Sequence, residues 1–184
     1  MDGRQLSERF DHFRHSAFRL ETRQRYAIGG AEEERLRAFR QGRPRPERSV
    51  TTNGYLAQVA RATLAGKHWS RVHIVDWPLS EYLRYELVGY VESAAVGEEI
   101  LIASRDTSPE LAGLREDFWL FDEGSRSEMA VVLDYSDGGE FTGAREVRDA
   151  AGIEQCRQAK AAAMRHAVRL NAFLAAVHDA ERVA

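Results

Sequence analysis

The sequence contains a single cysteine, Cys156, and this excludes a disulfide within the chain. Cysteine and histidine do not recur at the spacing of zinc ligands, so we expect no bound metal. No apolar run approaches the roughly 18 residues of a membrane-spanning helix, and residues 1–10 lack the apolar core of a signal peptide. The sequence therefore predicts a cytoplasmic protein that folds without cross-links.

Four common catalytic signatures are also missing. The sequence has no phosphate-binding GxxxxGK, no GxGxxG after a strand, no GxSxG elbow and no HExxH. Their absence argues against nucleotide hydrolysis by a P-loop, serine hydrolase chemistry and zinc hydrolysis. We expect a protein that works without a metal or nucleotide cofactor.

Lysine is scarce, because only Lys67 and Lys160 occur beside 24 arginines. Twelve of the arginines lie in residues 1–48 with eight acidic residues, which leaves a charge of +4 there and −7 in residues 49–184. This asymmetry would attract an anionic ligand to one side of the protein. The alternative is that arginine replaces lysine on a solvated face.

Length and patterning predict one α+β domain over residues 1–184, with a mainly antiparallel sheet of about five to seven strands packed against helices. Apolar spacings of three and four predict helices near residues 6–13, 31–42 and 80–97. Short apolar runs predict strands near residues 17–22, 98–104, 118–122, 129–136 and 140–147. Residues 55–75 are interpreted as a β-hairpin turning at Ala65 and Gly66, and residues 108–117 as a loop.

Residues 149–180 form the predicted C-terminal helical segment. Apolar side chains from Ile153 to Val177 alternate between spacings of three and four, interrupted by Lys160, and Asp149 is placed to cap the start. The pattern fits one long helix, or two helices with a break near Arg169 and Asn171 as the second cap.

The first candidate site is the segment RLETRQRY. On an extended strand Arg19, Glu21 and Arg23 would share one face. Two cations beside a carboxylate keep it ionised and leave donors for a phosphate or carboxylate ligand. A surface ion-pair ladder is the structural alternative.

Proline and arginine alternate in the segment RPRPE. Pro44 and Pro46 oppose helix formation and favour an extended connector that carries Arg43 and Arg45. These two arginines belong to the basic N-terminal portion and are further candidates for binding an anion.

The second candidate site is HWSRVHIVDWPLSEYLRYE, which spans a strand end and a helix start, where ligands are commonly held. Tyr82 and Glu86 lie one helical turn apart, so a phenol and a carboxylate could converge on one amine or hydroxyl. The segment also contains Trp69, Arg71, His73 and Trp77. Aromatic groups beside arginine could stack on an unpaired base. The alternative is that the tryptophans are buried anchors and that Glu86 pairs with Arg71.

The third candidate is DFWLFD, where Phe118 and Trp119 occupy opposite faces of a strand and Asp122 ends it. Core packing accounts for the aromatic residues, and a turn accounts for Asp122 better than a catalytic role does.

Taken together, FDHFRHSAFRLETRQRY, WSRVHIVDWPLSEYLRYEL and DFWLFD resemble DUF6879, a family of actinobacterial proteins of unknown function. The resemblance extends from about Phe10 to Phe173. It implies a chain of similar size that is often found near helix-turn-helix regulators, and a looser similarity to aminoacyl-tRNA-dependent transferases of natural-product pathways. It carries over no accepted catalytic residues.

Two functions follow as hypotheses. In the first, the protein transfers an aminoacyl group from charged tRNA to a small amine or hydroxyl acceptor, which requires only binding, orientation and proton transfer because the ester is already activated. The catalytic candidates are Glu86, Glu21 and Tyr82, and the candidates for binding substrate or tRNA are Arg19, Arg23, Arg43, Arg45, Trp69, Arg71 and Trp77. In the second, the same residues bind a regulator protein or a small effector without catalysis.

Overall fold

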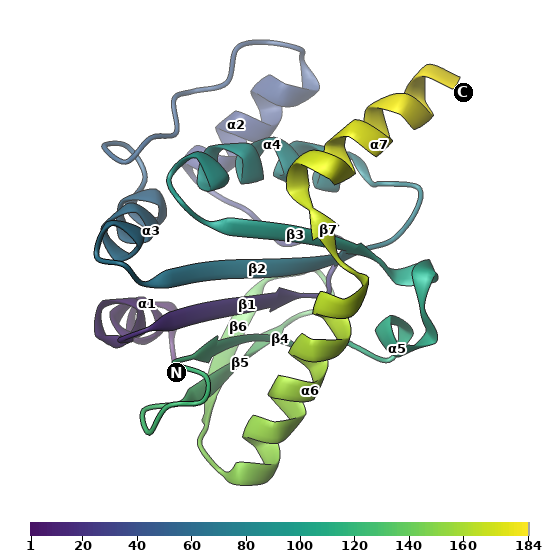
Figure 1. The fold of residues 1–184 in the computed structure, drawn as a ribbon. Helices are drawn as coiled ribbons and strands as arrows, with labels where there is room; N and C mark the ends of the chain where they lie inside the picture. Colours follow the sequence, from purple (N-terminus) through teal and green to yellow (C-terminus); the bar gives the residue numbers. More distant parts are fainter. Residues whose placement is uncertain (184) are drawn as a thin grey trace.

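A computed structural model describes residues 1–183, built around a seven-stranded sheet in the order β6-β5-β4-β1-β2-β3-β7 (Figure 1). The strands are β1 (Ser16–Glu21), β2 (His68–Val75), β3 (Glu99–Ser104), β4 (Asp117–Phe121), β5 (Met129–Tyr135), β6 (Phe141–Val147) and β7 (Val168–Arg169). β1, β2 and β3 run parallel, and the other neighbouring pairs are antiparallel. The prediction of an α+β fold with a mostly antiparallel sheet is confirmed.

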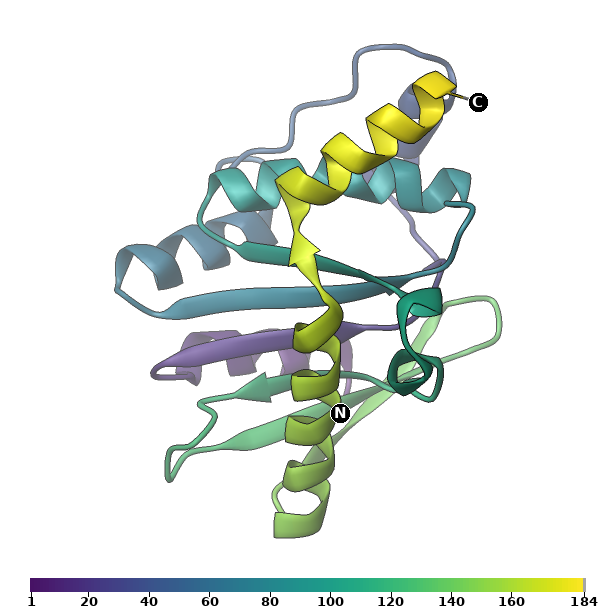
Figure 2. The same cartoon turned by 45° about the vertical axis from the view of Figure 1, so that its right-hand side comes forward.

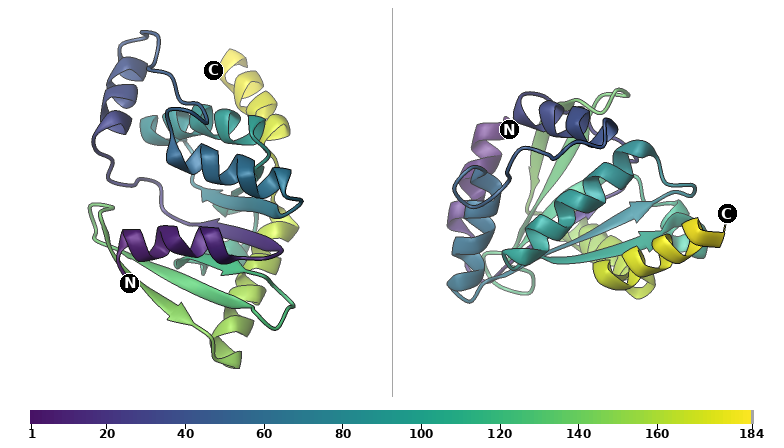
Figure 3. Two further views of the ribbon diagram at one scale, coloured as in Figure 1. Left: turned by 90° about the vertical axis from the view of Figure 1, so that its left-hand side faces the viewer. Right: turned by 90° about the horizontal axis from the view of Figure 1, so that it is seen from above.

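Helices cover both faces of the sheet. Within residues 1–183 they are α1 (Gly3–His12), α2 (Ala31–Arg40), α3 (Gly54–Leu64), α4 (Glu81–Ala95), α5 (Pro109–Ala112), α6 (Ala150–His166) and α7 (Leu170–Val183), with a 3₁₀ turn, η1 (Arg105–Thr107), before α5. α6 packs on one face, whereas α1, α3, α4 and α7 pack on the other and α2 lies against α4 (Figures 1 and 3). None of these helices combines the length and apolarity needed to cross a bilayer.

The two faces of the sheet differ in composition. On the α6 side, Phe18, Val72 and Leu120 belong to one continuous apolar cluster. On the opposite face the apolar residues form two separate clusters, one around Trp69 beneath α1 and α3, and one around Ile102 beneath α4 and α7. Buried charged side chains of β1 and β2 contribute to neither cluster. This division places a polar strip across the centre of the sheet.

Capping residues fix most of the predicted helix boundaries. The Ser80 side chain accepts a hydrogen bond from the Leu83 N–H at 3.1 Å, and Asp149 accepts one from Gly152 at 2.9 Å. Gly97 follows the end of α4 with φ of 104°, a conformation that favours glycine. The helices predicted near residues 6–13, 31–42 and 80–97 are confirmed as α1, α2 and α4.

The predicted β-hairpin over residues 55–75 is wrong in its first half. Residues Gly54–Leu64 form α3, in which Leu56, Val59 and Ala62 are buried at spacings of three. The Asn53 side chain caps this helix by accepting a hydrogen bond from the Leu56 N–H at 3.0 Å. The hairpin interpretation overlooked this cap and the helical spacing behind it. The predicted loop at residues 108–117 likewise contains the one-turn helix α5.

The C-terminal segment consists of two helices. α6 ends at His166, β7 pairs with β3, and α7 begins at Leu170, so the break falls near Arg169 without Asn171 as the cap. The chain crosses the edge of the sheet at β7, which puts α6 and α7 against opposite faces (Figure 2). The apolar spacing from Ile153 to Val177 continues through the break because α6 and α7 each bury their own part of it.

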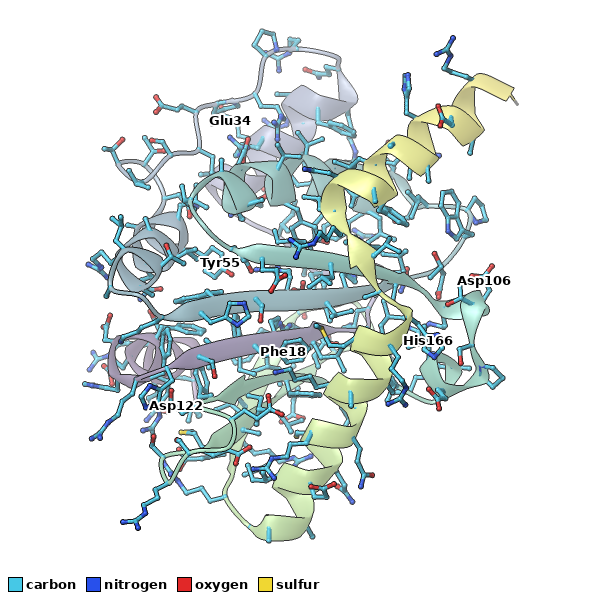
Figure 4. All side chains as sticks on the ribbon, in the orientation of Figure 1. Phe18, Glu34, Tyr55, Asp106, Asp122 and His166 are labelled. Carbon is cyan, nitrogen blue, oxygen red and sulfur yellow. The ribbon has the colours of Figure 1, made fainter. Side chains whose placement is uncertain are left out.

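Asp122 ties the end of β4 to the start of β1 (Figure 4). Its backbone has φ of 52°, and its carboxylate accepts hydrogen bonds from the N–H groups of Arg14, His15 and Ser16 at 2.6–3.2 Å. The side chain is only 2% exposed. These contacts hold three backbone donors that have no strand partner at this corner.

We predict that Asp122→Ala lowers the free energy of unfolding by about 2–4 kcal/mol, because three donors lose their acceptor and alanine disfavours positive φ. Urea denaturation of the two proteins measures the loss. Asp122→Asn keeps one acceptor oxygen and tolerates the backbone angle, so it should lose less. Asp137→Ala, in an exposed turn, is the control. Equal stability of Asp122→Ala and this control would contradict the role.

Candidate functional site

The polar strip consists of four side chains from the two central parallel strands. Arg19 and Glu21 of β1 are in register with Arg71 and His73 of β2, on the face opposite α6. Their exposed fractions are 3, 6, 7 and 0%. Charged groups this deeply buried are costly unless they are paired and hydrogen-bonded. The contacts around them therefore define the site.

Glu21 is the negative centre of the strip. Its Oε2 accepts hydrogen bonds from Arg71 Nη1 at 2.8 Å and from the Tyr90 hydroxyl at 2.7 Å, and its Oε1 lies 3.5 Å from Arg19 Nε. Burial alone would raise the pKa of Glu21, but the charges of Arg71 and Arg19 outweigh burial and hold it at about 2. Glu21 is therefore a permanent anion at neutral pH.

Arg71 connects Glu21 to three other parts of the fold. Its Nε donates to Glu98 Oε1 at 2.6 Å, and its Nη2 donates to the hydroxyl of Tyr55, which comes from α3 (Figure 4). Its guanidinium carbon lies 4.9 Å from the centre of the Tyr90 ring on α4. Each of the three guanidinium nitrogens makes a hydrogen bond, so Arg71 fixes the strip.

His73 is oriented by a backbone contact. Its Nε2 lies 2.8 Å from the carbonyl oxygen of Arg23, and a carbonyl can only accept, so Nε2 carries a proton. Its Nδ1 lies 2.7 Å from the Tyr90 hydroxyl, which is also bonded to Glu21. Burial lowers the pKa of His73, and this favours the neutral ring, which accepts at Nδ1. His73 and Glu21 therefore share a single hydroxyl proton.

Glu21, His73 and Glu86 place one possible metal ligand each within 4.8 Å of one another. Two contacts argue against a cation there. Arg71 is bonded to Glu21 and would repel it, and the Tyr90 hydroxyl lies 2.7 Å from both Glu21 Oε2 and His73 Nδ1. The hydroxyl occupies the space that an ion would need. The geometry suits a proton-sharing network better than a metal centre.

A cavity of about 220 Å³ lies beside this network, with room for one small polar molecule. It is bounded by α4, the start of α2 and the segment that leads into α3. Four tyrosines, two carboxylates and two arginines provide most of its polar lining: Tyr55, Tyr82, Tyr85, Tyr90, Glu32, Glu86, Arg48 and Arg71. A cavity with aromatic walls and both signs of charge can bind and orient a small ligand.

Another cavity, of about 260 Å³, lies on the α6 side of the sheet between Leu114, Phe118 and Cys156. Burial raises the pKa of the Cys156 thiol to about 11, so it stays protonated and unreactive. The side chains with strongly shifted acid–base behaviour gather on the opposite face, and we place the candidate site there.

Glu86 is the least satisfied charged group of the site. Its Oε2 is buried and has no hydrogen-bond partner within the described residues. Burial and the charge of Glu21 raise the pKa of Glu86 to about 8. Burial and Glu86 also raise the pKa of Tyr82, one turn earlier on α4, so its phenol stays a donor. Glu86 can thus exchange a proton near neutral pH, whereas Glu21 cannot.

Comparison with known families gives one match, to the model described as "Domain of unknown function (DUF6879)", over residues 4–175. The chain belongs to the DUF6879 family. The comparisons with curated proteins and with solved structures gave no match. The family match confirms the resemblance to DUF6879 and carries no activity, so the similarity to aminoacyl-tRNA-dependent transferases stays a prediction.

The fold of this DUF6879 chain brings the predicted catalytic residues together. Glu86 and Tyr82 line the cavity, and Glu21 lies behind it, joined through Arg71 and Tyr90. The alternative pairing of Glu86 with Arg71 does not occur as an ion pair, because Arg71 pairs with Glu21 and Glu98. Sequence reasoning thus identified several side chains of the site but not their partners.

Several residues predicted to bind tRNA are inaccessible. Trp69 is 0% exposed within the apolar cluster beneath α1 and α3, so it has no free ring face for a base. Arg19 donates to Asp117 at 2.8 Å and is 3% exposed. The assignment of Trp69 and Arg19 to tRNA contacts therefore needs correction, because these side chains build the interior. Arg71 is also largely buried, but it lines the cavity, where it can face a small ligand.

The other predicted binding residues lie at different places on the surface. Arg23 donates to the carbonyl of Ser136 at 2.7 Å, and Trp77 is 43% exposed with its ring against Phe173 of α7. Arg43 is exposed, and Arg45 pairs with Glu92 of α4. Arg45 belongs to the connector between α2 and α3, and its pairing with Glu92 brings it to the helix that lines the cavity.

Four residues of the site were missed as functional candidates: Tyr55, Tyr90, Glu98 and Arg48. Tyr90 was expected only in the apolar stripe of its helix, and Tyr55 in a strand of the hairpin. A usable signal was that Glu21 and His73 place polar groups on two strands, because strands with buried polar side chains need polar partners in the helices that cover them. Recognising it requires knowing that β1 and β2 are neighbours.

The raised pKa of Glu86 has a measurable effect on stability. A carboxyl whose pKa is higher in the folded state than in the unfolded state costs nothing at low pH, and its cost grows as pH rises from about 4.5 to about 8. We predict that Glu86→Gln removes this cost, so that the variant gains on the order of 2 kcal/mol, or about 4–8 °C in Tm, over the native protein at pH 8.5.

Thermal unfolding of both proteins between pH 5 and pH 9 tests this prediction, and the gain should shrink toward pH 5. Glu81→Gln, at an exposed position on the same helix, is the matched control and should show no growing gain. A gain independent of pH would contradict the assignment.

Proposed function

We propose that this DUF6879 protein transfers an aminoacyl group from aminoacyl-tRNA to a small amine or hydroxyl acceptor in the cavity, with Glu86 as the general base. The observation that carries the proposal is the buried Oε2 of Glu86, which has no hydrogen-bond partner within the described residues and lies beside a cavity of small-molecule size. A base with a pKa of about 8 is matched to removing a proton at physiological pH. Charged tRNA and small acceptors meet in the cytoplasm, which we propose as the location.

The reaction needs one base and one donor. The lone pair of the acceptor nitrogen or oxygen attacks the ester carbonyl, a bond to the carbonyl carbon forms, and the bond from that carbon to the 3′ oxygen of the tRNA breaks. Glu86 takes the proton that the acceptor loses and returns it to the leaving 3′ oxygen. The Tyr82 phenol remains protonated and can donate a hydrogen bond to the developing oxyanion.

Glu21 has a different role from the one first considered for it. Its low pKa makes it a poor base, so we assign it the fixed negative charge that keeps Glu86 neutral until a nucleophile binds. An ammonium entering the cavity would lower the pKa of Glu86, so that Glu86 first releases its own proton to solvent and then, as a carboxylate, accepts one from the ammonium. Arg71 is a positioning residue, because it holds Glu21 and Tyr55 in place.

The test is transfer of a labelled amino acid from charged tRNA to small amines and hydroxyl compounds of the kind used in natural-product pathways. Glu86→Gln should lower kcat/KM by about 10²–10⁴-fold with the fold intact. The native rate should rise with pH and level off above about pH 8, because the free enzyme must lose the Glu86 proton.

Glu81→Gln is the control and should keep native activity. Transfer that is equally fast in Glu86→Gln would refute the assignment of the base. A protein that ignores charged tRNA but forms a stoichiometric complex with a helix-turn-helix regulator would favour the alternative of a binding module over the enzyme.

A further inference from the structure

Three arginines converge on a single carboxylate next to the cavity. Arg35 Nη2 lies 2.6 Å from Glu92 Oε1, Arg45 Nη2 lies 3.0 Å from the same oxygen, and Arg48 Nη1 lies 3.4 Å from Oε2. Arg35 comes from α2, and Arg45 and Arg48 come from the connector between α2 and α3, whereas Glu92 is on α4. Figure 3 shows α2 and this connector running beside α4. We call this group the arginine cluster.

The cluster has more positive charge than its partner can balance. Three guanidinium groups share one carboxylate, and the further acceptors of Arg35 and Arg48 include the neutral carbonyls of Pro46 and Gly89 and the hydroxyl of Ser93. Arg35 is 4% exposed, and its Nε has no hydrogen-bond partner within the described residues; the same holds for Arg45 Nη1. Unused donors in a buried cationic group are costly, and a bound anion would satisfy them.

The cluster adjoins the cavity through Arg48. This side chain lines the cavity and donates to the carbonyl oxygen of Gly89 at 3.0 Å. Gly89 follows Glu86 by three residues, or about 4.5 Å along the axis of α4. The arginines converge on Glu92, which follows Glu86 by six residues, so an anion held by them would lie between about one and two helical turns from the proposed base.

We infer that the arginine cluster is a phosphate-binding site, and that it takes a phosphodiester near the 3′ end of the tRNA donor. The planar set of N–H donors on arginine matches the oxygens of a phosphate, and Glu92 lies between the three guanidinium groups. The identity of the donor rests on the proposed function, whereas the affinity for phosphate does not. The competing explanation is that the arginines serve only to clamp the connector onto α4.

The test measures binding of inorganic phosphate, and of a short single-stranded RNA ending in CCA, to the full-length protein at constant ionic strength. Both should bind, and Arg45→Ala should weaken both by about tenfold or more. For the RNA, the slope of log affinity against log salt should fall by about 1 in this variant. Arg37→Ala is the matched control, since Arg37 lies on α2, is exposed and pairs with Glu33.

Glu92→Gln provides a second test, in which the inference predicts a gain of phosphate binding and not a loss. Removing the competing carboxylate should strengthen phosphate binding if the cluster is an anion site, even where the variant is less stable. A clamp predicts lower stability with no gain in binding. Unchanged or weaker phosphate binding in Glu92→Gln, or equal binding by the Arg45→Ala and Arg37→Ala variants, would overturn the inference.

The two probes separate this inference from the proposed function. Binding of phosphate without binding of the RNA would keep the site and overturn the tRNA as its source, in favour of a phosphorylated small molecule. Binding of both without acyl transfer would support the site and remove the proposed reaction.

Discussion

The buried ion pair between Arg71 and Glu21 is the contact on which the other features of the site depend. It lies where β1 and β2 run side by side, and its arginine reaches Glu98 before β3 and Tyr55 at the start of α3. One side chain thus ties two strands, a helix and a loop together. Losing Arg71 would leave the buried Glu98 without an ion-pair partner among the described residues, which is costly. The strip therefore constrains the fold together with the apolar clusters on either side of it.

The same pair explains why two neighbouring carboxyl groups behave differently. The two arginines beside Glu21 keep it charged, and that fixed charge, together with burial, keeps a proton on Glu86. The charge of Arg71 and the Tyr90 hydroxyl oppose this rise in the pKa of Glu86, but burial and Glu21 outweigh them, and Arg71 forms its ion pairs with Glu21 and Glu98 instead. The acid–base character of Glu86 is thus set by the arrangement of its neighbours and not by its own position on α4.

The sequence predicted local features well and spatial neighbours poorly. Ser80 and Asp149 marked helix starts because a capping side chain acts within three residues of its own position. The alternation of Arg19 and Glu21 predicted a polar strand face, but the burial of that face depends on α3 and α4, which are distant in the sequence. The wrong prediction of a hairpin had the same origin. Because α3 was not predicted, neither the position of Tyr55 nor the packing of α3 over Trp69 could be foreseen. Partners far apart in sequence, such as Arg35 and Glu92, leave no local signal.

Two carboxyl groups of α4 lie in opposite surroundings. Glu86 makes no ion pair within the described residues, and six residues later Glu92 pairs with three arginines. Six residues of helix place them about 9 Å apart along its axis. Natural proteins violate the rule of paired burial mainly at functional sites. A ligand that brings a nucleophile to Glu86 and a phosphate to the arginines around Glu92 would satisfy both groups at once. A polar strip with a purely structural role requires no such ligand, and neither does a clamp that only holds the connector on α4.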